Sequence, residues 1–268
     1  MDPHTPSPIF PPASVEEVDR LARHAFGGVR PVRGLLHVLA AWRGPAECLV
    51  AVRETGELPP SDLRKVLWSL ARARCDAWVV EAGDLDGAAT RRRGLGSSRA
   101  SERVFADWRR SRLGKANPTV TLVVAPEGEV DFDHPFFAAG ERILMLVGGD
   151  PWALESRAAD RGVEVVGAAQ PSTAQAVGFL RREFGAAGVL LDLPPEALGS
   201  LAREPGVDEL LLSVCETPQL AVSSEGSWVF PVADLRERFE QQDERFVEGE
   251  PATTWSHHHW RRHGLTNS

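Results

Sequence analysis

The chain has 268 residues, of which 43% are hydrophobic and 25% are charged, which is enough for one sizeable globular domain. Its formal net charge of −8 disfavours nonspecific nucleic-acid binding, and no apolar run reaches the roughly 18 residues of a membrane span. Cys48, Cys75 and Cys215 are far apart in apolar surroundings and are expected to be reduced, and no secretory signal is recognisable. We therefore expect a cytoplasmic protein that binds neither nucleic acid nor membrane.

Composition along the chain predicts three parts. Residues 1–13 contain five prolines and are expected to be disordered. Residues 14–230 alternate between apolar runs and amphipathic stretches, and are expected to form an α/β domain. Residues 231–268 become polar, then acidic, then rich in His and Trp, and are expected to form a C-terminal extension.

Helices and strands are predicted to alternate in chain order. Ser14 is the predicted N-cap of a helix that ends at Gly27 and Gly28, and Ser61 is the predicted N-cap of a second helix. The remaining predicted helices are residues 101–112, 151–160, 173–184, one that begins near 197, and a polar pattern over 235–246. The predicted strands are residues 35–41, 77–80, 119–124, 143–147, 163–166, 189–191 and 210–214, the last of which is expected to close the sheet. This alternation predicts a mostly parallel sheet that helices cover on both faces.

The loop Asp192-Leu193-Pro194-Pro195-Glu196 lies between a predicted buried strand and a predicted helix. An open α/β sheet usually binds a phosphate group at such a place. Glycine lets the backbone approach the phosphate closely, whereas proline removes the N–H donors. Leucine and two prolines stand where glycine is expected, so this loop is a poor phosphate cradle.

Two short motifs carry a family resemblance. Asp133-His134-Pro135-Phe136-Phe137 is similar to an Asp-His-Pro-Leu-Phe turn, and Val207-Asp208-Glu209-Leu210 is similar to a Val-Asp-Glu-Leu segment. With the order of segments over residues 15–215, they resemble the bacterial pyrimidine reductases of riboflavin biosynthesis. The resemblance implies a dihydrofolate-reductase-like α/β/α sandwich of three layers, NADPH as the family's cofactor, and a homodimer.

The functional motifs of that family are altered. Ser-Leu-Asp-Gly, which helps to hold the substrate, is replaced by Ala41-Trp42-Arg43-Gly44. Gly-Ala-Gly-Thr, which lines the cofactor, is replaced by Glu81-Ala82-Gly83-Asp84, and Glu-Gly-Gly-Pro-Thr, which binds its diphosphate, is replaced by the loop 192–196. By resemblance, the cofactor-binding positions are Ala82, Gly83, Asp84, Asp192, Leu193, Pro194 and Glu196, and the substrate-binding positions are His37, Ala41 and Arg43.

Two hypotheses for function follow. A carboxylate next to a phosphate is costly without a cation, so three altered motifs together disfavour NADPH binding in the family's manner. The first hypothesis is a catalytically silent homologue that acts as a binding or assembly subunit without a cofactor. The alternative is an active NAD(P)H-dependent reductase of a pyrimidine- or pterin-like substrate, such as 5-amino-6-(5-phosphoribosylamino)uracil. No catalytic residue is identified, and Trp42, Arg43, Leu193 and Pro194 are expected to close the cleft to a dinucleotide.

The C-terminal residues and a basic stretch have other interpretations. Four histidines lie within residues 257–263, and on a helix His259 and His263 would share a face, but no complete ligand set is present and no metal is expected. Trp255 and Trp260 are expected to dock on an apolar surface of the same dimer or of a protein partner.

The basic stretch 91–115 is expected to be a solvated surface, and the alternative is that Arg91, Arg92 and Arg93 bind a phosphate group.

Overall fold

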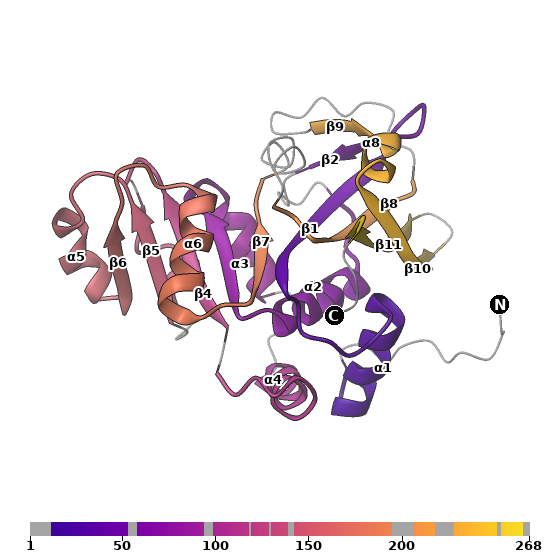
Figure 1. Cartoon of the computed structure of the whole chain (residues 1–268), viewed down its shortest axis with the longest axis horizontal. Helices are drawn as coiled ribbons and strands as arrows, with labels where there is room; N and C mark the ends of the chain where they lie inside the picture. Colours follow the sequence, from indigo (N-terminus) through magenta and orange to yellow (C-terminus); the bar gives the residue numbers. More distant parts are fainter. Residues whose placement is uncertain are drawn as a thin grey trace.

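The computed structural model describes residues 12–52, 58–93, 99–117, 119–128, 130–138, 142–194, 206–217, 228–250 and 253–264. Within these residues, eleven strands form one sheet that runs the length of the molecule (Figure 1). The main strand order is β10-β11-β8-β1-β7-β3-β4-β5-β6, and β2 and β9 branch from β1. The sheet therefore places segments from the start, middle and end of the chain side by side.

The strands are β1 (Gly34–Arg43), β2 (Cys48–Ala51), β3 (Ala77–Glu81), β4 (Val120–Ala125), β5 (Ile143–Val147), β6 (Val163–Gly167), β7 (Gly188–Asp192), β8 (Glu209–Cys215), β9 (Trp228–Pro231), β10 (Phe239–Glu250) and β11 (Thr253–Arg262). The helices are α1 (Val15–Phe26), α2 (Asp62–Arg74), α3 (Leu85–Arg93), α4 (Arg99–Leu113), α5 (Trp152–Ala159), α6 (Thr173–Phe184) and α8 (Val232–Arg236), with the 3-10 turns η1 (Ala82–Asp84) and η2 (Pro135–Ala138).

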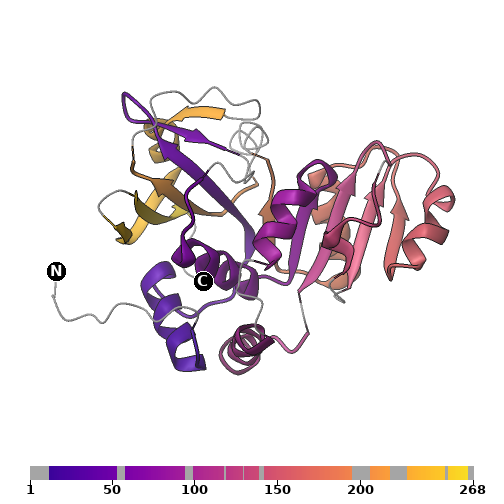
Figure 2. The same ribbon diagram turned by 180° about the vertical axis from the view of Figure 1, so that it is seen from behind.

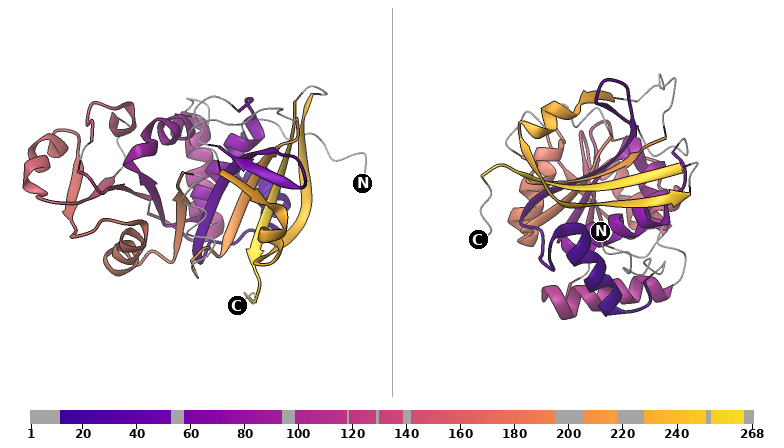
Figure 3. Two further views of the ribbon diagram at one scale, coloured as in Figure 1. Left: turned by 90° about the horizontal axis from the view of Figure 1, so that it is seen from above. Right: turned by 90° about the vertical axis from the view of Figure 1, so that its right-hand side faces the viewer.

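The strands from β8 to β6 are parallel, and the four others are antiparallel to their neighbours. β1 lies between β7 and β8, with Leu36 opposite Leu190 on one side and Glu209 on the other. β11 pairs with β8 in the antiparallel sense and β10 pairs with β11, so this hairpin forms one end of the sheet, far from α5 (Figure 3). The prediction of a mostly parallel α/β sheet is confirmed.

Alternate strand residues face two separate cores. Val80 and Val123 pack with residues of α1 to α5 on one face, whereas Val79 and Leu122 pack with residues of α6 and α8 on the other. Seen from behind, the same helices flank the sheet on its two sides (Figure 2). This is the three-layer arrangement that the family resemblance implied.

Local signals in the sequence set several helix ends. The Ser14 hydroxyl accepts a hydrogen bond from the Glu17 amide at 3.2 Å, and the Ser61 hydroxyl accepts one from the Arg64 amide at 3.0 Å. Gly27 ends α1 in the left-handed region with φ 64°. Both predicted N-caps and the predicted end of the first helix are confirmed.

The C-terminal region differs from the prediction. The helix expected over residues 235–246 is wrong, because α8 ends at Arg236 and β10 begins at Phe239. The strand at 210–214 does not close the sheet, since β11 pairs with β8. Cross-strand pairing overrides the helical preference of the Glu, Gln and Arg residues in this segment. The boundary expected at residue 231 falls just before α8, and the sheet continues beyond it.

None of the helices within the described ranges is long and apolar enough to cross a bilayer.

All three cysteines are free thiols. Cys75 is fully buried, and burial raises the pKa of its thiol to about 12.

Candidate functional site

The carboxyl ends of the parallel strands meet at one edge of the sheet, which is the usual ligand-binding edge of an open α/β fold. Three of the altered motifs reach this edge. Arg43 ends β1, Glu81 ends β3 and Asp192 ends β7. The structure thus brings the three motifs together, although they are far apart in the sequence.

Arg43 forms an ion pair at this edge with Glu216, the first residue after β8. Its Nε and Nη2 groups donate to the two carboxylate oxygens of Glu216, each at 2.9 Å. The Glu216 side chain is 16% exposed and that of Arg43 is 34% exposed. The hydrogen bond to Glu216 raises the pKa of the Arg43 guanidinium against the opposing effect of burial. The position where the family has a substrate-binding carboxylate therefore holds a cation paired within the chain.

Glu216 also joins a polar network on the C-terminal hairpin. The hydroxyl of Ser256 in β11 donates to Glu216 and lies 2.9 Å from His258 Nε2, and His258 Nδ1 lies 3.0 Å from Gln241 Nε2 in β10. Ser256 is fully buried, so its hydroxyl does not serve as a nucleophile toward a bound molecule. The network instead fixes the ends of β1 and β8 against the hairpin.

Two other residues predicted to bind substrate lie in the interior. His37 and Ala41 are both 0% exposed. His37 Nδ1 lies 2.9 Å from the Leu191 carbonyl oxygen of β7, in the middle of the sheet. Neither residue presents a side chain to a ligand at the strand ends, because both are covered by the core.

The turn after β3 forms the short η1. Asp84 is 7% exposed, so its carboxylate points inward, whereas Gly83 is exposed. A side chain added at Gly83 would meet no atom within 4 Å. Of the three cofactor positions predicted here, Gly83 is the one that offers open backbone.

The loop after β7 turns inward as far as the structure describes it. Asp192 and Leu193 are 3% and 4% exposed, and Pro194 is also buried. Leu193 packs into the core on the α6 side of the sheet. Glu196 and the helix predicted from residue 197 lie outside the described residues. The closing of the cleft to a dinucleotide by Trp42, Arg43, Leu193 and Pro194 therefore stays a prediction.

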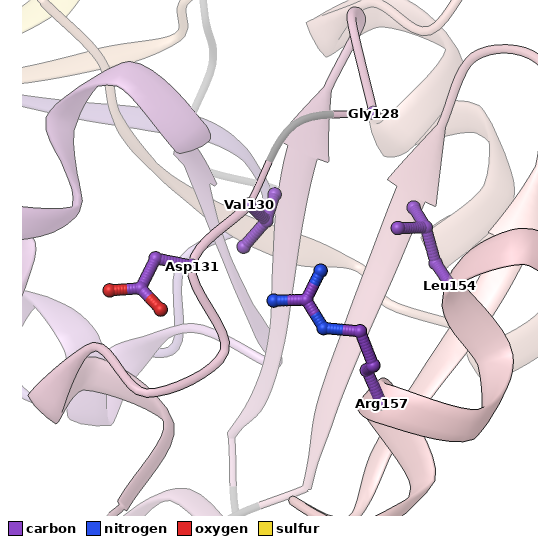
Figure 4. A pocket seen from close by; sticks show the side chains of 5 residues that line it. All are labelled: Gly128, Val130, Asp131, Leu154 and Arg157. Carbon is purple, nitrogen blue, oxygen red and sulfur yellow. The ribbon is translucent and has the colours of Figure 1, made fainter.

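A hollow of about 530 Å³ opens beside α5, at the carboxyl ends of β4 and β5 (Figure 4). Figure 4 shows the Arg157 side chain extending from α5 toward Val130. The Arg157 guanidinium also lies 5.5 Å from the centre of the Phe132 ring. No motif in the sequence predicted this hollow. Its lining residues are Gly128, Val130, Asp131, Leu154 and Arg157.

Two basic residues of the stretch 91–115, Arg109 and Lys115, are used inside the fold, whereas Arg103, Arg110 and Arg112 are exposed as expected. Arg109 is 7% exposed and donates to the backbone carbonyls of Ala73, Cys75 and Asn117. The bonds to Ala73 and Cys75 give partners to carbonyl groups at the C-terminal end of α2. Lys115 pairs with Asp76. The side chains of residues 91–93 lie outside the described part, so the phosphate grip proposed for them stays untested.

His257, His258 and His259 lie on β11 and His263 follows it, so His259 and His263 do not share a helix face. Among the described residues, no three metal-ligating side chains are grouped so as to hold an ion. Trp255 and Trp260 are 1% and 4% exposed and pack into the chain's own core. The apolar surface predicted for the two tryptophans, in the same dimer or in a partner, is the core of the chain itself, and strand geometry buries one on each face of the sheet.

The strand order, the two helical layers and the edge where the motifs meet define an α/β protein with a dihydrofolate-reductase-like fold. The structure is similar to RibD from Acinetobacter baumannii, with 14% identity and a TM-score of 0.54, over 89% of this chain and 60% of that chain. It is also similar to a pyrimidine reductase-like protein from Corynebacterium diphtheriae, with 15% identity and a TM-score of 0.53, over 86% of this chain and 92% of that chain.

The chain thus spans 60% of the length of the RibD chain. No protein-family model and no curated protein sequence matches it. At such low identity the likeness shows the fold alone, and it confirms the fold class that the motifs predicted. The activity must be argued from the residues at the strand ends.

Proposed function

We propose that this chain is a diverged homologue of the pyrimidine reductases that has lost the reductase chemistry and acts as a binding or assembly subunit. The observation that carries the proposal is the bidentate Arg43–Glu216 pair, which occupies the end of β1 and β8. A ligand that needs either group must first break a charge-assisted contact within the chain.

The strand ends are a poor fit for the diphosphate of NADPH. Glu81 and Asp192 place carboxylates at the ends of β3 and β7, and Arg43 of β1 is already paired with Glu216. A diphosphate near these carboxylates would lose hydration without gaining a counter-charge. Leucine and two prolines also stand where a phosphate cradle has glycine, which disfavours a close approach of the backbone.

A titration with NADPH tests this proposal. We expect no change in thermal stability, with an active pyrimidine reductase as the positive control. A ligand that binds the native state stabilises it by about 2.7 kcal/mol at a concentration of 100 times its Kd. A saturating stabilisation of this chain by NADPH contradicts the loss of cofactor binding.

The second candidate is an active NAD(P)H-dependent reductase of a pyrimidine- or pterin-like ring. The open backbone at Gly83 and the hollow beside Arg157 favour it, since both lie at the strand ends. Oxidation of NADPH in the presence of 5-amino-6-(5-phosphoribosylamino)uracil would support this candidate. In that case Gly83→Val should slow the reaction, because the added side chain blocks the open backbone.

We also propose a homodimer, as the family resemblance implies. Three strands, β6, β9 and β10, have one neighbour each among the described strands. An unpaired strand edge is a ready surface for a second copy. Sedimentation or light scattering at micromolar concentration should give twice the chain mass, and a monomer contradicts the proposal.

A further inference from the structure

The hairpin of β10 and β11 joins the sheet through β11, and β10 also packs against α1 and α8. β11 pairs with β8, and β10 pairs with β11. Along β11, His257 and His259 face α1 and α2 and are 2% and 4% exposed. Two ionisable rings are thus buried in the seam that holds this hairpin on the sheet.

His257 lies in a tight and positively charged setting. Its Nδ1 is 2.9 Å from the Ser213 hydroxyl of β8, and its ring stacks near that of Trp255. The Arg64 guanidinium of α2 lies over the same tryptophan, 5.0 Å from the ring centre. Burial, followed by the charges of Arg64 and His258, lowers the pKa of His257 to about 3. The fold therefore keeps this ring neutral.

His259 lies at the centre of a buried ionic cluster. Its Nε2 is 3.0 Å from Glu209 of β8, which also accepts two hydrogen bonds from Arg74 of α2 at 3.2 Å. Arg261 of β11 lies 3.9 Å from Glu209, and Phe26 of α1 packs edge-on against the His259 ring at 5.1 Å. Burial lowers the pKa of His259 although Glu209 acts in the opposite direction.

We propose that the β10–β11 hairpin is an acid-sensitive flap that separates from β8 as a unit when the buried His257 and His259 take up protons. The imidazoles are dry in the closed state and become hydrated when β11 leaves β8. Acid therefore favours the open state, because only there do both rings bind protons at little cost. Opening would expose the edge of β8 to pairing with another strand.

The size of the effect follows from proton linkage. A histidine with a pKa of 6.5 in water and about 3 when buried favours opening roughly 30-fold more at about pH 5 than at about pH 7.5. His259 adds to this factor in the same direction. Glu209 remains charged over this range, because its pKa is lowered to about 2. The response between these two pH values therefore belongs to the histidines.

Hydrogen exchange by mass spectrometry on the full chain tests the flap. Protection factors, corrected for the intrinsic exchange rate, should fall at least tenfold at β11 between about pH 7.5 and pH 5. β5 in the centre of the parallel part should keep its protection. The variant His257→Asn with His259→Gln should remove most of the pH response, since neither new side chain titrates there and the remaining His258 is only half-buried. His263→Gln, which changes an exposed histidine just after β11, is the matched control and should respond as the wild type does.

Two results would overturn the proposal. Corrected protection of β11 that stays constant down to about pH 5 shows that the seam does not respond to acid. Equal loss of protection at β5 and β11 shows global unfolding rather than a flap. Both readouts use the wild-type chain, so they decide the question even if the double variant fails to fold.

Discussion

The amino and carboxyl edges of the parallel strands use charged side chains in different ways. At the amino edge, Arg74 and Glu209 are each nearly buried, with side chains 3% and 6% exposed. At the carboxyl edge, Arg43 and Glu216 are paired but partly exposed, at 34% and 16%. Buried charges must be fully paired to be tolerated, whereas partly exposed ones can change at little cost. The amino edge is therefore constrained by folding and the carboxyl edge is free to diverge.

This contrast explains which motifs keep the family pattern. Asp208 and Glu209 belong to the segment that resembles the family, and both act in the framework. Asp208 accepts a hydrogen bond from the Leu35 amide at 2.7 Å, and Glu209 accepts two from Arg74. A side chain at Gly34 would lie 2.0 Å from the Asp208 carboxylate, so the position requires glycine. The altered motifs lie at the other edge, where the charged pair Arg43–Glu216 is partly exposed, although apolar motif residues such as Ala41 and Leu193 still pack into the core.

The largest expected effect comes from breaking the amino edge at Glu209. Glu209→Gln keeps the shape and removes the charge that Arg74 requires, so the free energy of unfolding should fall by about 3–5 kcal/mol. Unfolding by a chemical denaturant measures this loss in the free energy of unfolding. Glu164→Gln is the matched control, because Glu164 pairs with Arg142 on the surface with both side chains more than half exposed. The control should change stability by less than about 1 kcal/mol. Equal losses would show that burial does not separate the two edges.

Acid should weaken the same edge. Burial opposes ionisation of Glu209, but Arg74 and His259 outweigh it and lower the folded-state pKa from 4.5 to about 2. The resulting stability is complete above pH 4.5 and is lost as pH falls toward 2. The loss should reach about 3 kcal/mol, and Glu209→Gln should remove this part of the pH dependence. Unfolding midpoints of the wild type and of Glu209→Gln, measured between these pH values, give the comparison.

A backbone change at the start of β7 tests the packing of the amino edge. A side chain at Gly188 would lie 2.2 Å from the Val32 carbonyl oxygen. Gly188→Ala should therefore destabilise the fold by about 2 kcal/mol. Gly178→Ala is the matched control, because Gly178 lies within α6 and a side chain there meets nothing within 4 Å. The control should stabilise the fold by about 0.5–1 kcal/mol, since alanine favours helix. Thermal unfolding of both variants suffices.

The framework could be predicted where its signals are local. Residues 143–147 form the predicted strand because they are one apolar run. Residues 173–184 form the predicted helix, which the N-cap Ser172 begins and Gly185 ends. The pairing of β11 with β8 could not be predicted, since it depends on partners about 45 residues away rather than on local propensity.

The candidate site was predictable only in part. Its place at the strand ends follows from the order of strands, which is why Arg43 and Asp192 were found. Glu216 was missed because its partner Arg43 is 173 residues away, and no spacing rule connects them. His37 lies in an apolar strand, which favours a buried histidine with a hydrogen-bond partner, and the Leu191 carbonyl is that partner.

The smallest expected effect comes from breaking the carboxyl edge at Arg43. Arg43→Gln removes one partner of a partly exposed pair, and Ser256 still donates to Glu216. The free energy of unfolding should therefore fall by about 1 kcal/mol, well below the loss at Glu209. Arg142→Gln, at an exposed pair with Glu164, is the matched control and should lose about 0.5 kcal/mol or less. A loss at Arg43 as large as that at Glu209 would mean that the carboxyl edge is also held by folding, and the altered motifs would then need another cause.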